Sequence, residues 1–178
     1  MLLEDKVAFI TGGGSGIGEA TAKLFASEGA NVIITDIDDV SGERVSNEIG
    51  SKATYLKCDV TNEEDVLAVI NEITKTHSRI DCAVNNAGIT GNPSNIEDTT
   101  YDNWFKVIHV NLTGVFFCLK HEITQMIKQG SGSIVNVSSG AGLIAVPSMA
   151  AYCASKHALL GLTKTAATEN ISRGIRVN

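Results

Sequence analysis

Short apolar segments alternate with segments of helical periodicity along almost the whole chain, and this alternation constrains the fold more than any other feature. Strands are predicted at residues 6–11, 31–36, 53–58, 80–86 and 133–138, with a sixth beginning at residue 175. Helices are predicted at residues 15–29, 40–49, 62–76, 99–128 and 149–172. The strands are β-branched and apolar without clean alternation, which is typical of a parallel sheet buried on both faces. The pattern therefore predicts one doubly wound α/β domain over residues 1–178.

The first predicted helix has apolar residues at helical spacing, and Gly29 follows them as a stop signal. Residues three and four positions apart share one face of a helix. This spacing places Ile17, Ala20, Thr21, Leu24 and Phe25 on one face of the helix.

The charge and hydropathy of the chain limit the classes of partner that it is expected to bind. Its 20 Asp and Glu residues outnumber 14 Lys and Arg residues, which gives a net charge of −6 at pH 7. Such an acidic chain is not expected to bind the phosphates of nucleic acids. No apolar stretch reaches the ~18 residues of a membrane span, and the first residues show no secretory signal. We expect a cytoplasmic protein with no membrane partner, whose 4 cysteines are reduced thiols.

A glycine-rich turn, TGGGSGIG, follows the first predicted strand at residues 11–18. A doubly wound fold binds the pyrophosphate of a dinucleotide at this position. Glycine lets the backbone approach phosphate oxygens, and the N-terminus of the next helix supplies N–H donors. The spacing is G-x-x-x-G-x-G over Gly12, Gly16 and Gly18, so it fits neither G-x-G-x-x-G nor a phosphate loop. We interpret the turn as a nucleotide-binding site, and the alternative is a merely tight turn.

Asp36 ends the second predicted strand, where a dinucleotide site has an acidic residue about 20 positions beyond the glycine turn. Such a carboxylate accepts hydrogen bonds from the ribose hydroxyls. No Lys or Arg stands at position 37 or in the turn, and Asp38 and Asp39 add negative charge. The pattern favours NAD over NADP, and the alternative for Asp36 is a helix-capping or turn residue.

Tyr152 and Lys156 lie four positions apart on a predicted helix and so share one of its faces. A free phenol has a pKa of about 10 and is a poor base at neutral pH. A lysine ammonium ~4 Å away favours a phenolate by roughly 4 kcal/mol. Ser139 follows the fifth predicted strand, at the sheet edge where open α/β folds bind ligands. The three residues are candidates for proton transfer, although each alone could be a surface or capping residue.

Two patterns are incomplete versions of other sites. His121 and Glu122 match the start of H-E-x-x-H, but position 125 is Gln, so the pattern lacks its second histidine. No serine stands in G-x-S-x-G, the nucleophile elbow of hydrolases. The cysteine spacings fit no zinc framework either, and we expect no metal site.

Taken together, the motifs resemble those of the short-chain dehydrogenase/reductase family. The matching segments are TGGGSGIG at residues 11–18, Asp59-Val60, Asn85-Asn86-Ala87-Gly88, Asn111, GSIVNVSS at residues 132–139, and Tyr152 with Lys156. They follow the order and spacing of the family over nearly the whole chain. The resemblance implies a Rossmann fold and an oxidoreductase that moves a hydride between NAD(H) and a small secondary alcohol or ketone.

The resemblance also implies a role for each matching residue. Tyr152 would be the general acid/base, Lys156 would assist it and hold the nicotinamide ribose, and Ser139 would bind the substrate oxygen. Asn111 would position a water between Lys156 and solvent, and Asp59 would accept from the adenine amino group. Asp36 would select NAD, while Thr11 and Asn85 would brace the strand ends. The remaining expected cofactor contacts are Gly12, Ser15, Gly16, Ile17, Gly18, Val60, Asn86, Ala87 and Gly88.

Two alternatives remain open: an NADPH-linked 3-oxoacyl or carbonyl reductase, which Asp36 opposes, and a non-catalytic nucleotide-binding regulator, which the intact Ser139, Tyr152 and Lys156 oppose. Members of the family usually run longer, so we expect the natural chain to continue beyond Asn178 and to complete the substrate pocket there. The small residues of 149–172 and the family resemblance predict a homo-oligomer, a dimer or tetramer, packed through 99–128 and 149–172.

Overall fold

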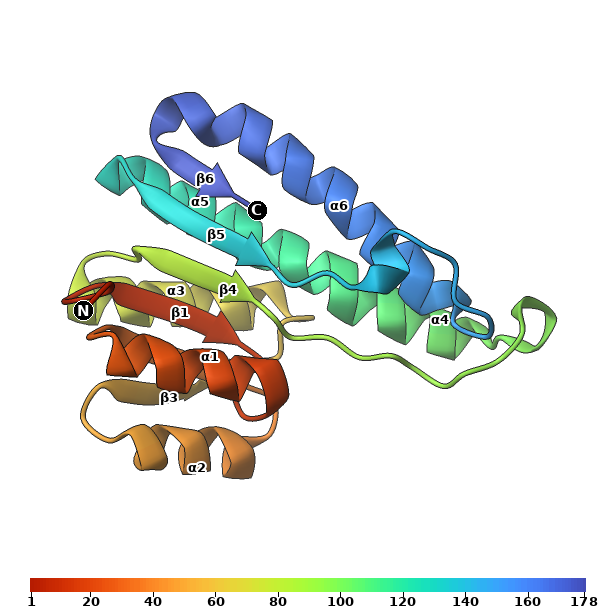
Figure 1. Cartoon of the computed structure of the whole chain (residues 1–178), viewed down its shortest axis with the longest axis horizontal. Helices are drawn as coiled ribbons and strands as arrows, with labels where there is room; N and C mark the ends of the chain where they lie inside the picture. The colour runs from red at the N-terminus through yellow and green to blue at the C-terminus, as the bar shows by residue number, and fades with distance from the viewer.

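Six parallel strands form the centre of the molecule, in the order β3-β2-β1-β4-β5-β6 (Figure 1). The computed structural model describes residues 1–178. The strands are β1 (Val7–Thr11), β2 (Asn31–Asp36), β3 (Ala53–Lys57), β4 (Cys82–Asn85), β5 (Gly132–Asn136) and β6 (Ile175–Val177). The chain winds outward from β1 in one direction and from β4 in the other. This confirms the predicted doubly wound parallel sheet, and its switch point lies between the ends of β1 and β4.

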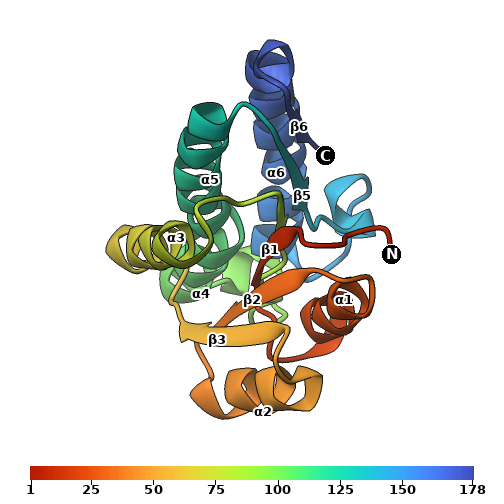
Figure 2. The same ribbon diagram turned by 90° about the vertical axis from the view of Figure 1, so that its left-hand side faces the viewer.

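Helices cover the sheet on two faces (Figure 2). One core joins the sheet to α1 (Gly16–Ser27) and α2 (Asp39–Ile49). The other joins it to α3 (Glu63–His77), α5 (Val115–Gln129) and α6 (Ala150–Asn170), with α4 (Tyr101–Ile108) leading into α5. Side chains alternate between the faces of a strand, so Ala8 and Ile10 enter the first core while Val7 and Phe9 enter the second.

Short 3₁₀ turns occupy Ile96–Asp98, Gly140–Gly142 and Ile171–Arg173. The helix boundaries follow local capping chemistry. Asp38 caps α2 by accepting from the backbone N–H of Val40, and Asn62 caps α3 by accepting from that of Glu64. The chain leaves α1 through Gly29, whose φ of 95° is one that glycine tolerates readily. No helix is long and apolar enough to cross a membrane.

The apolar face that the sequence indicates for the first helix is only partly the face that α1 packs against the sheet. Ile17 and Leu24 are exposed by 64% and 58%, and the fully buried residues of α1 are Gly18 and Ala22. The helix approaches the glycine turn so closely that a Cβ at Gly18 would lie 2.1 Å from the carbonyl oxygen of Gly12. Small residues form the closest contact, Phe25 packs against the same core, and Ile17 and Leu24 remain exposed.

The predicted helix over residues 99–128 is in fact interrupted. A π-helical turn at His109–Gly114 separates α4 from α5 and contains the buried Asn111. π-Helical turns are rare and often occur at functional sites. The interruption changes the direction in which Asn111 is presented, which hydrophobic periodicity alone does not reveal.

Candidate functional site

The glycine-rich turn lies across the carboxyl ends of β1 and β4. Gly12 and Gly16 have φ values of 63° and 55°, in the left-handed region that favours glycine. The side-chain amide of Asn86, just beyond β4, donates to the carbonyl oxygens of Thr11 and Gly12 at 3.1 and 2.9 Å. The turn is thus fastened to the neighbouring strand, and the N-terminus of α1 opens toward the sheet edge.

Thr11 fastens the same two strand ends from the other side. Its hydroxyl oxygen accepts the backbone N–H of Asn86 at 3.1 Å and that of Ala87 at 3.2 Å. The side chain is almost completely buried, so these bonds are shielded from water. Thr11 therefore links the ends of β1 and β4, which is the role that the family resemblance implies for it.

Asp36 holds the turn from the end of β2. Its Oδ2 accepts the backbone N–H of Gly14 at 3.0 Å, and its Oδ1 accepts that of Asp38 at 3.1 Å. An ionised carboxylate offers about four acceptor positions, so Asp36 keeps two for a ligand hydroxyl. The opposite side of Gly14 is held by Arg44 from α2, whose guanidinium donates to the Gly14 carbonyl at 3.0 Å.

Arg44 is a contact that the local sequence around the turn does not reveal, because it comes from the middle of α2. Its guanidinium also bonds both carboxylate oxygens of Glu19 and one of Glu48. Lys23 bonds the same two carboxylates at 2.7 Å. The two cations and two anions cancel, so Arg44 does not offer an uncompensated positive charge beside Asp36.

A cleft of about 510 Å³ begins at this turn and runs along the carboxyl edge of the sheet. Ten of the residues named from the sequence line it: Gly12, Ser15, Gly16, Ile17, Asp36, Asp59, Val60, Asn86, Ala87 and Gly88. Gly18 is not in its lining, because Gly18 packs beneath the turn against Gly12. The cleft has the size of a small-molecule or cofactor site.

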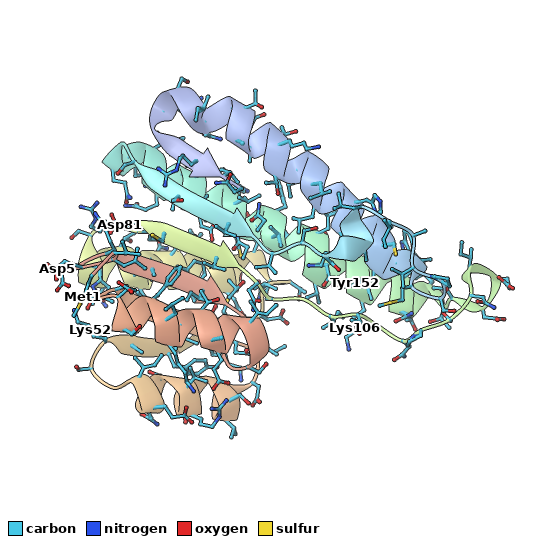
Figure 3. The ribbon with its side chains drawn as sticks, in the orientation of Figure 1. Met1, Asp5, Lys52, Asp81, Lys106 and Tyr152 are labelled. Carbon is cyan, nitrogen blue, oxygen red and sulfur yellow. The ribbon has the colours of Figure 1, made fainter.

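Five further residues, which lie outside the sequence motifs, line the cleft: Ile37, Cys58, Ile89, Lys106 and Val110. Ile37 follows Asp36 and Cys58 precedes Asp59 at strand ends. Their positions next to these residues are the sequence signal that could have identified them as part of the cleft. Lys106 comes from α4, and no motif marks it. In Figure 3 Lys106 and Tyr152 both lie in the half of the molecule toward which the strands point.

Asp59 stands where the chain leaves β3 for α3. Its Oδ1 accepts from the backbone N–H and the hydroxyl of Thr61, at 2.9 and 2.7 Å. These bonds fix the carboxylate at the wall of the cleft. Its second oxygen makes no hydrogen bond with the protein and is free to accept one from a ligand.

The side chain of Lys156 crosses from α6 toward the end of β5. It is 5% exposed, and its Nζ donates to the carbonyl oxygen of Val137 at 2.7 Å. Burial lowers the pKa of Lys156. The ammonium lies 5.7 Å from the centre of the Tyr152 ring, and a Cβ placed on Gly88 would lie 3.7 Å from Nζ. Gly88 lines the cleft, so the cleft passes beside Lys156, while Lys156 and Tyr152 are not themselves among its lining residues.

Ser139 begins the 3₁₀ turn after β5, and its hydroxyl oxygen accepts the backbone N–H of Ala141 at 3.1 Å. The neighbouring Ser138 donates its hydroxyl hydrogen to the carbonyl oxygen of Lys156 at 3.3 Å. Gly142 packs against the same carbonyl, which a Cβ there would approach to 2.8 Å. The segment that carries Ser139 is therefore seated on the turn of α6 that carries Lys156.

Asn111 is completely buried in the π-helical turn. Its amide hydrogens go to the carbonyl of Ile89 at 2.8 Å and to the hydroxyl of Ser155 at 3.1 Å. Its Oδ1 accepts the backbone N–H of Ile89 at 2.8 Å, which leaves one acceptor position. A Cβ on Gly88 would lie 3.2 Å from this oxygen, so Asn111 adjoins the same end of the cleft as Lys156.

Comparison with known proteins identifies the family. A sequence model of the short chain dehydrogenases matches residues 6–178. The chain is 47% identical to secoisolariciresinol dehydrogenase of Forsythia intermedia, with 99% of this chain and 64% of that protein covered. It is 42% identical to 2,5-dichloro-2,5-cyclohexadiene-1,4-diol dehydrogenase of Sphingobium indicum, with 99% and 71% covered.

A solved structure, NAD⁺-bound xylitol dehydrogenase, superposes with a TM-score of 0.97 at 38% identity, and covers 100% of this chain and 70% of its own. The chain thus spans 64–71% of the length of these relatives. The match confirms both the resemblance drawn from the motifs and the Rossmann fold that it implied. This chain is a member of the short-chain dehydrogenase/reductase family of oxidoreductases.

Proposed function

We propose that this chain binds NAD(H) in the cleft and interconverts a secondary alcohol and its ketone, with Tyr152 transferring the hydroxyl proton. The carrying observation is that the cleft runs from Asp36 to Gly88, and that Gly88 lies beside the Lys156 ammonium, whose neighbour is the Tyr152 ring. This arrangement offers a dinucleotide site with a proton donor and an adjacent cation beside one end of it.

The residues present fit a nicotinamide dinucleotide. Ser15, Gly16 and Ile17 stand at the N-terminus of α1, where backbone N–H groups and the helix dipole favour a pyrophosphate. The free acceptor positions of Asp36 suit ribose hydroxyls, whereas a 2′-phosphate would be repelled by its charge. The charge-neutral network around Arg44 offers such a phosphate no free cation. These features support NAD rather than NADP, and they disfavour the alternative of an NADPH-linked reductase.

The nicotinamide, when bound, accepts or returns a hydride at the substrate carbon. The chain contributes the movement of the proton and the position of the substrate oxygen. Tyr152 takes the hydroxyl proton as general base in oxidation and returns it in reduction. The buried ammonium of Lys156 stabilises negative charge on the phenol oxygen. Ser139 accepts from Ala141, so its own hydroxyl hydrogen remains available to the substrate oxygen.

The substrate side of the site is formed by the segment after Ser139. Leu143 and Ile144 are exposed by 75% and 65%. An apolar wall of this kind suits a carbocyclic substrate better than a polyol. Among the relatives, one is named for a cyclohexadienediol and another for xylitol. We propose that the substrate is a secondary alcohol with an apolar ring.

We also propose that the chain forms a homo-oligomer through α5 and α6. Phe116 of α5 is 48% exposed, and a Cβ on Gly161 of α6 would meet no atom within 4 Å. Exposed apolar and small residues on these two helices leave room for the close approach of a second backbone. This supports a dimer or tetramer and concerns the same helices that the sequence indicates.

A panel of alcohols tests the proposed reaction. Cyclohexanol, a cyclohexanediol, xylitol and 2-propanol are each offered with NAD⁺ and with NADP⁺, and the absorbance of the reduced cofactor is followed. We expect the cyclic alcohols with NAD⁺ to give the highest kcat/KM. Turnover only with NADP⁺ would establish the alternative reductase, and turnover with neither cofactor for any alcohol would favour a non-catalytic regulator.

A further inference from the structure

A carboxyl group lies in the core without a positively charged partner. Glu122 of α5 is completely buried, and its only hydrogen bond is from the side-chain amide of Asn85, at 3.0 Å to Oε2. Its other oxygen, Oε1, has no partner. The side-chain oxygen of Asn85 has none either. Two buried acceptors, Oε1 of Glu122 and Oδ1 of Asn85, therefore have no donor, although the two side chains are joined by one hydrogen bond.

Such a group is costly to bury as an ion. A carboxylate without a cation or several donors loses its hydration and gains little in return. Burial raises the pKa of Glu122 to about 8, against the single opposing bond from Asn85. The titratable group that faces it is the Cys118 thiol, one turn earlier on α5, whose pKa burial also raises. Both groups are therefore neutral at pH 7, and Glu122 carries a proton.

The same amide of Asn85 extends the contact to two more elements. Its nitrogen also donates to Oδ1 of Asn136 in β5 at 3.0 Å. Asn136 in turn donates to the hydroxyl of Thr163 in α6 at 2.9 Å. A buried polar chain thus joins α5, β4, β5 and α6 below the carboxyl edge of the sheet. Buried polar networks of this kind fix a unique packing only when each member is satisfied.

The network ends at Lys156. The backbone carbonyl of Asn85 accepts the N–H of Val137 at 2.9 Å. The carbonyl of that same Val137 accepts from Nζ of Lys156 at 2.7 Å. The position of the Lys156 ammonium is consequently set by the carbonyl of Val137, a residue whose backbone N–H Asn85 holds, and Glu122 bonds the side chain of Asn85.

We propose that Glu122 is a positioning residue, kept as a neutral carboxylic acid beneath the active site, which fixes Asn85 and through it the Val137 carbonyl that holds Lys156. A proton on the carboxyl supplies the hydrogen that the Glu122–Asn85 pair lacks. Ionisation removes that hydrogen, so Oε1 of Glu122 and Oδ1 of Asn85 are both left without a donor. The chain of bonds to Lys156 is loosened as a result. The consequence for catalysis rests on the proposed function, whereas the protonation of Glu122 does not.

Infrared spectroscopy tests the protonation without any substrate. The carbonyl stretch of a carboxylic acid is separate from carboxylate bands and shifts in D₂O. We expect this band at pH 7 in the parent and in Glu63→Gln, and its loss in Glu122→Gln. Glu63 is the matched control because it contacts the same helix through Lys120 and His121 but has a lowered pKa, from its bond with Lys120 first and with His121 second. Absence of the band in the parent would overturn the proposal.

The pH dependence of stability gives a second test. The folded pKa of Glu122 lies above its ordinary value of 4.5, so the folded state binds more protons between about pH 4.5 and 8. The contribution of Glu122 to the free energy of unfolding is therefore full below pH 4.5 and is lost as the pH rises to about 8. Glu122→Gln cannot titrate, so its stability relative to the parent should rise across this window. A constant difference would contradict a buried acid.

Kinetics separate positioning from mere structural support. Glu122→Leu removes the acceptor of Asn85, and we expect kcat for ketone reduction at pH 7 to fall about 10- to 100-fold with little change in KM or in NADH binding. Glu122→Gln should retain the kcat of the parent at pH 7 and exceed it above pH 8, where the parent ionises. A lowered melting temperature with an unchanged kcat in Glu122→Leu would reduce Glu122 to a structural residue. If the parent shows no turnover, the infrared and stability results still decide the protonation.

Discussion

The ammonium of Lys156 lies 5.7 Å from the centre of the Tyr152 ring and donates its hydrogen bond to Val137 rather than to the phenol oxygen. A cation at this distance from an aromatic face is attracted to it electrostatically. Because its hydrogen bond goes to Val137, Lys156 does not block the phenol oxygen, which in the proposed reaction exchanges a proton with the substrate.

Replacement of Tyr152 by Phe tests the proton route. The ring remains, so the fold and the binding of NADH should persist. Loss of the hydroxyl should lower kcat by about 10²–10⁴ because general acid/base assistance disappears. Steady-state kinetics and NADH fluorescence titration measure the two quantities. A variant that turns over at nearly the parental rate would show that the proton takes another path.

Asp36 should set the cofactor preference. We expect the parent to favour NAD over NADP by at least about 10-fold in kcat/KM, equivalent to about 1.4 kcal/mol. Asp36→Ala removes the charge that repels a 2′-phosphate and the acceptor for ribose hydroxyls. We therefore expect kcat/KM to fall with NAD and to rise with NADP. Asp39→Ala is the control, because it removes a nearby carboxylate at the start of α2 that bonds Tyr55 and not the glycine turn. Equal use of both cofactors by the parent would contradict this role.

Gly18 should tolerate no side chain. A Cβ there would meet the carbonyl oxygen of Gly12 at 2.1 Å, so Gly18→Ala must displace either α1 or the glycine turn. Overpacking of this kind costs about 1–3 kcal/mol of unfolding free energy, and the displaced turn should weaken NAD binding. Gly161→Ala is the matched helical control, since nothing lies within 4 Å of its Cβ. Calorimetric titration measures NAD binding, and denaturant unfolding measures the free energy of unfolding. A Gly18→Ala variant that is unchanged in both would refute this prediction.

Assembly can be tested on the exposed face of α6. Light scattering at micromolar concentration should give the mass of a dimer or tetramer. Gly161→Arg fits the isolated chain, because the position faces open space, but would separate two closely packed copies of α6. We expect this variant to be monomeric and folded by circular dichroism. A monomeric parent, or an arginine variant with the parental mass, would exclude this interface.

The fold was predictable because its signals are local. Strand runs, capping residues such as Asn62 and the stop at Gly29 each act within a few positions, and the structure places elements where these signals predict them. The apolar face indicated by the sequence of α1 differs from its packed face because of tertiary contacts. Hydrophobic spacing groups Leu24 with Ile17, but the packed face runs through Gly18 and Ala22. Gly18 lies about 120° around the helix from Leu24.

The cleft was predictable where a motif marks a strand end, as at Asp36 and Gly88. Residues that arrive from elsewhere in the fold carry no such mark. Arg44 reaches the glycine turn from the second helix, and Lys106 reaches the cleft from α4. Glu122 stands in an incomplete metal motif, yet its actual neighbour is Asn85, and only the packing of α5 on β4 shows this.

Transfer of a labelled hydride tests the central claim most directly. A cyclic secondary alcohol carrying deuterium on its carbinol carbon is incubated with the protein and NAD⁺, and the reduced cofactor is examined by mass spectrometry. The proposed reaction predicts NADH that carries one deuterium in the parent, and a formation rate lower by about 10²–10⁴ in Tyr152→Phe. Reduced cofactor without deuterium, or none at all from any secondary alcohol, would contradict it.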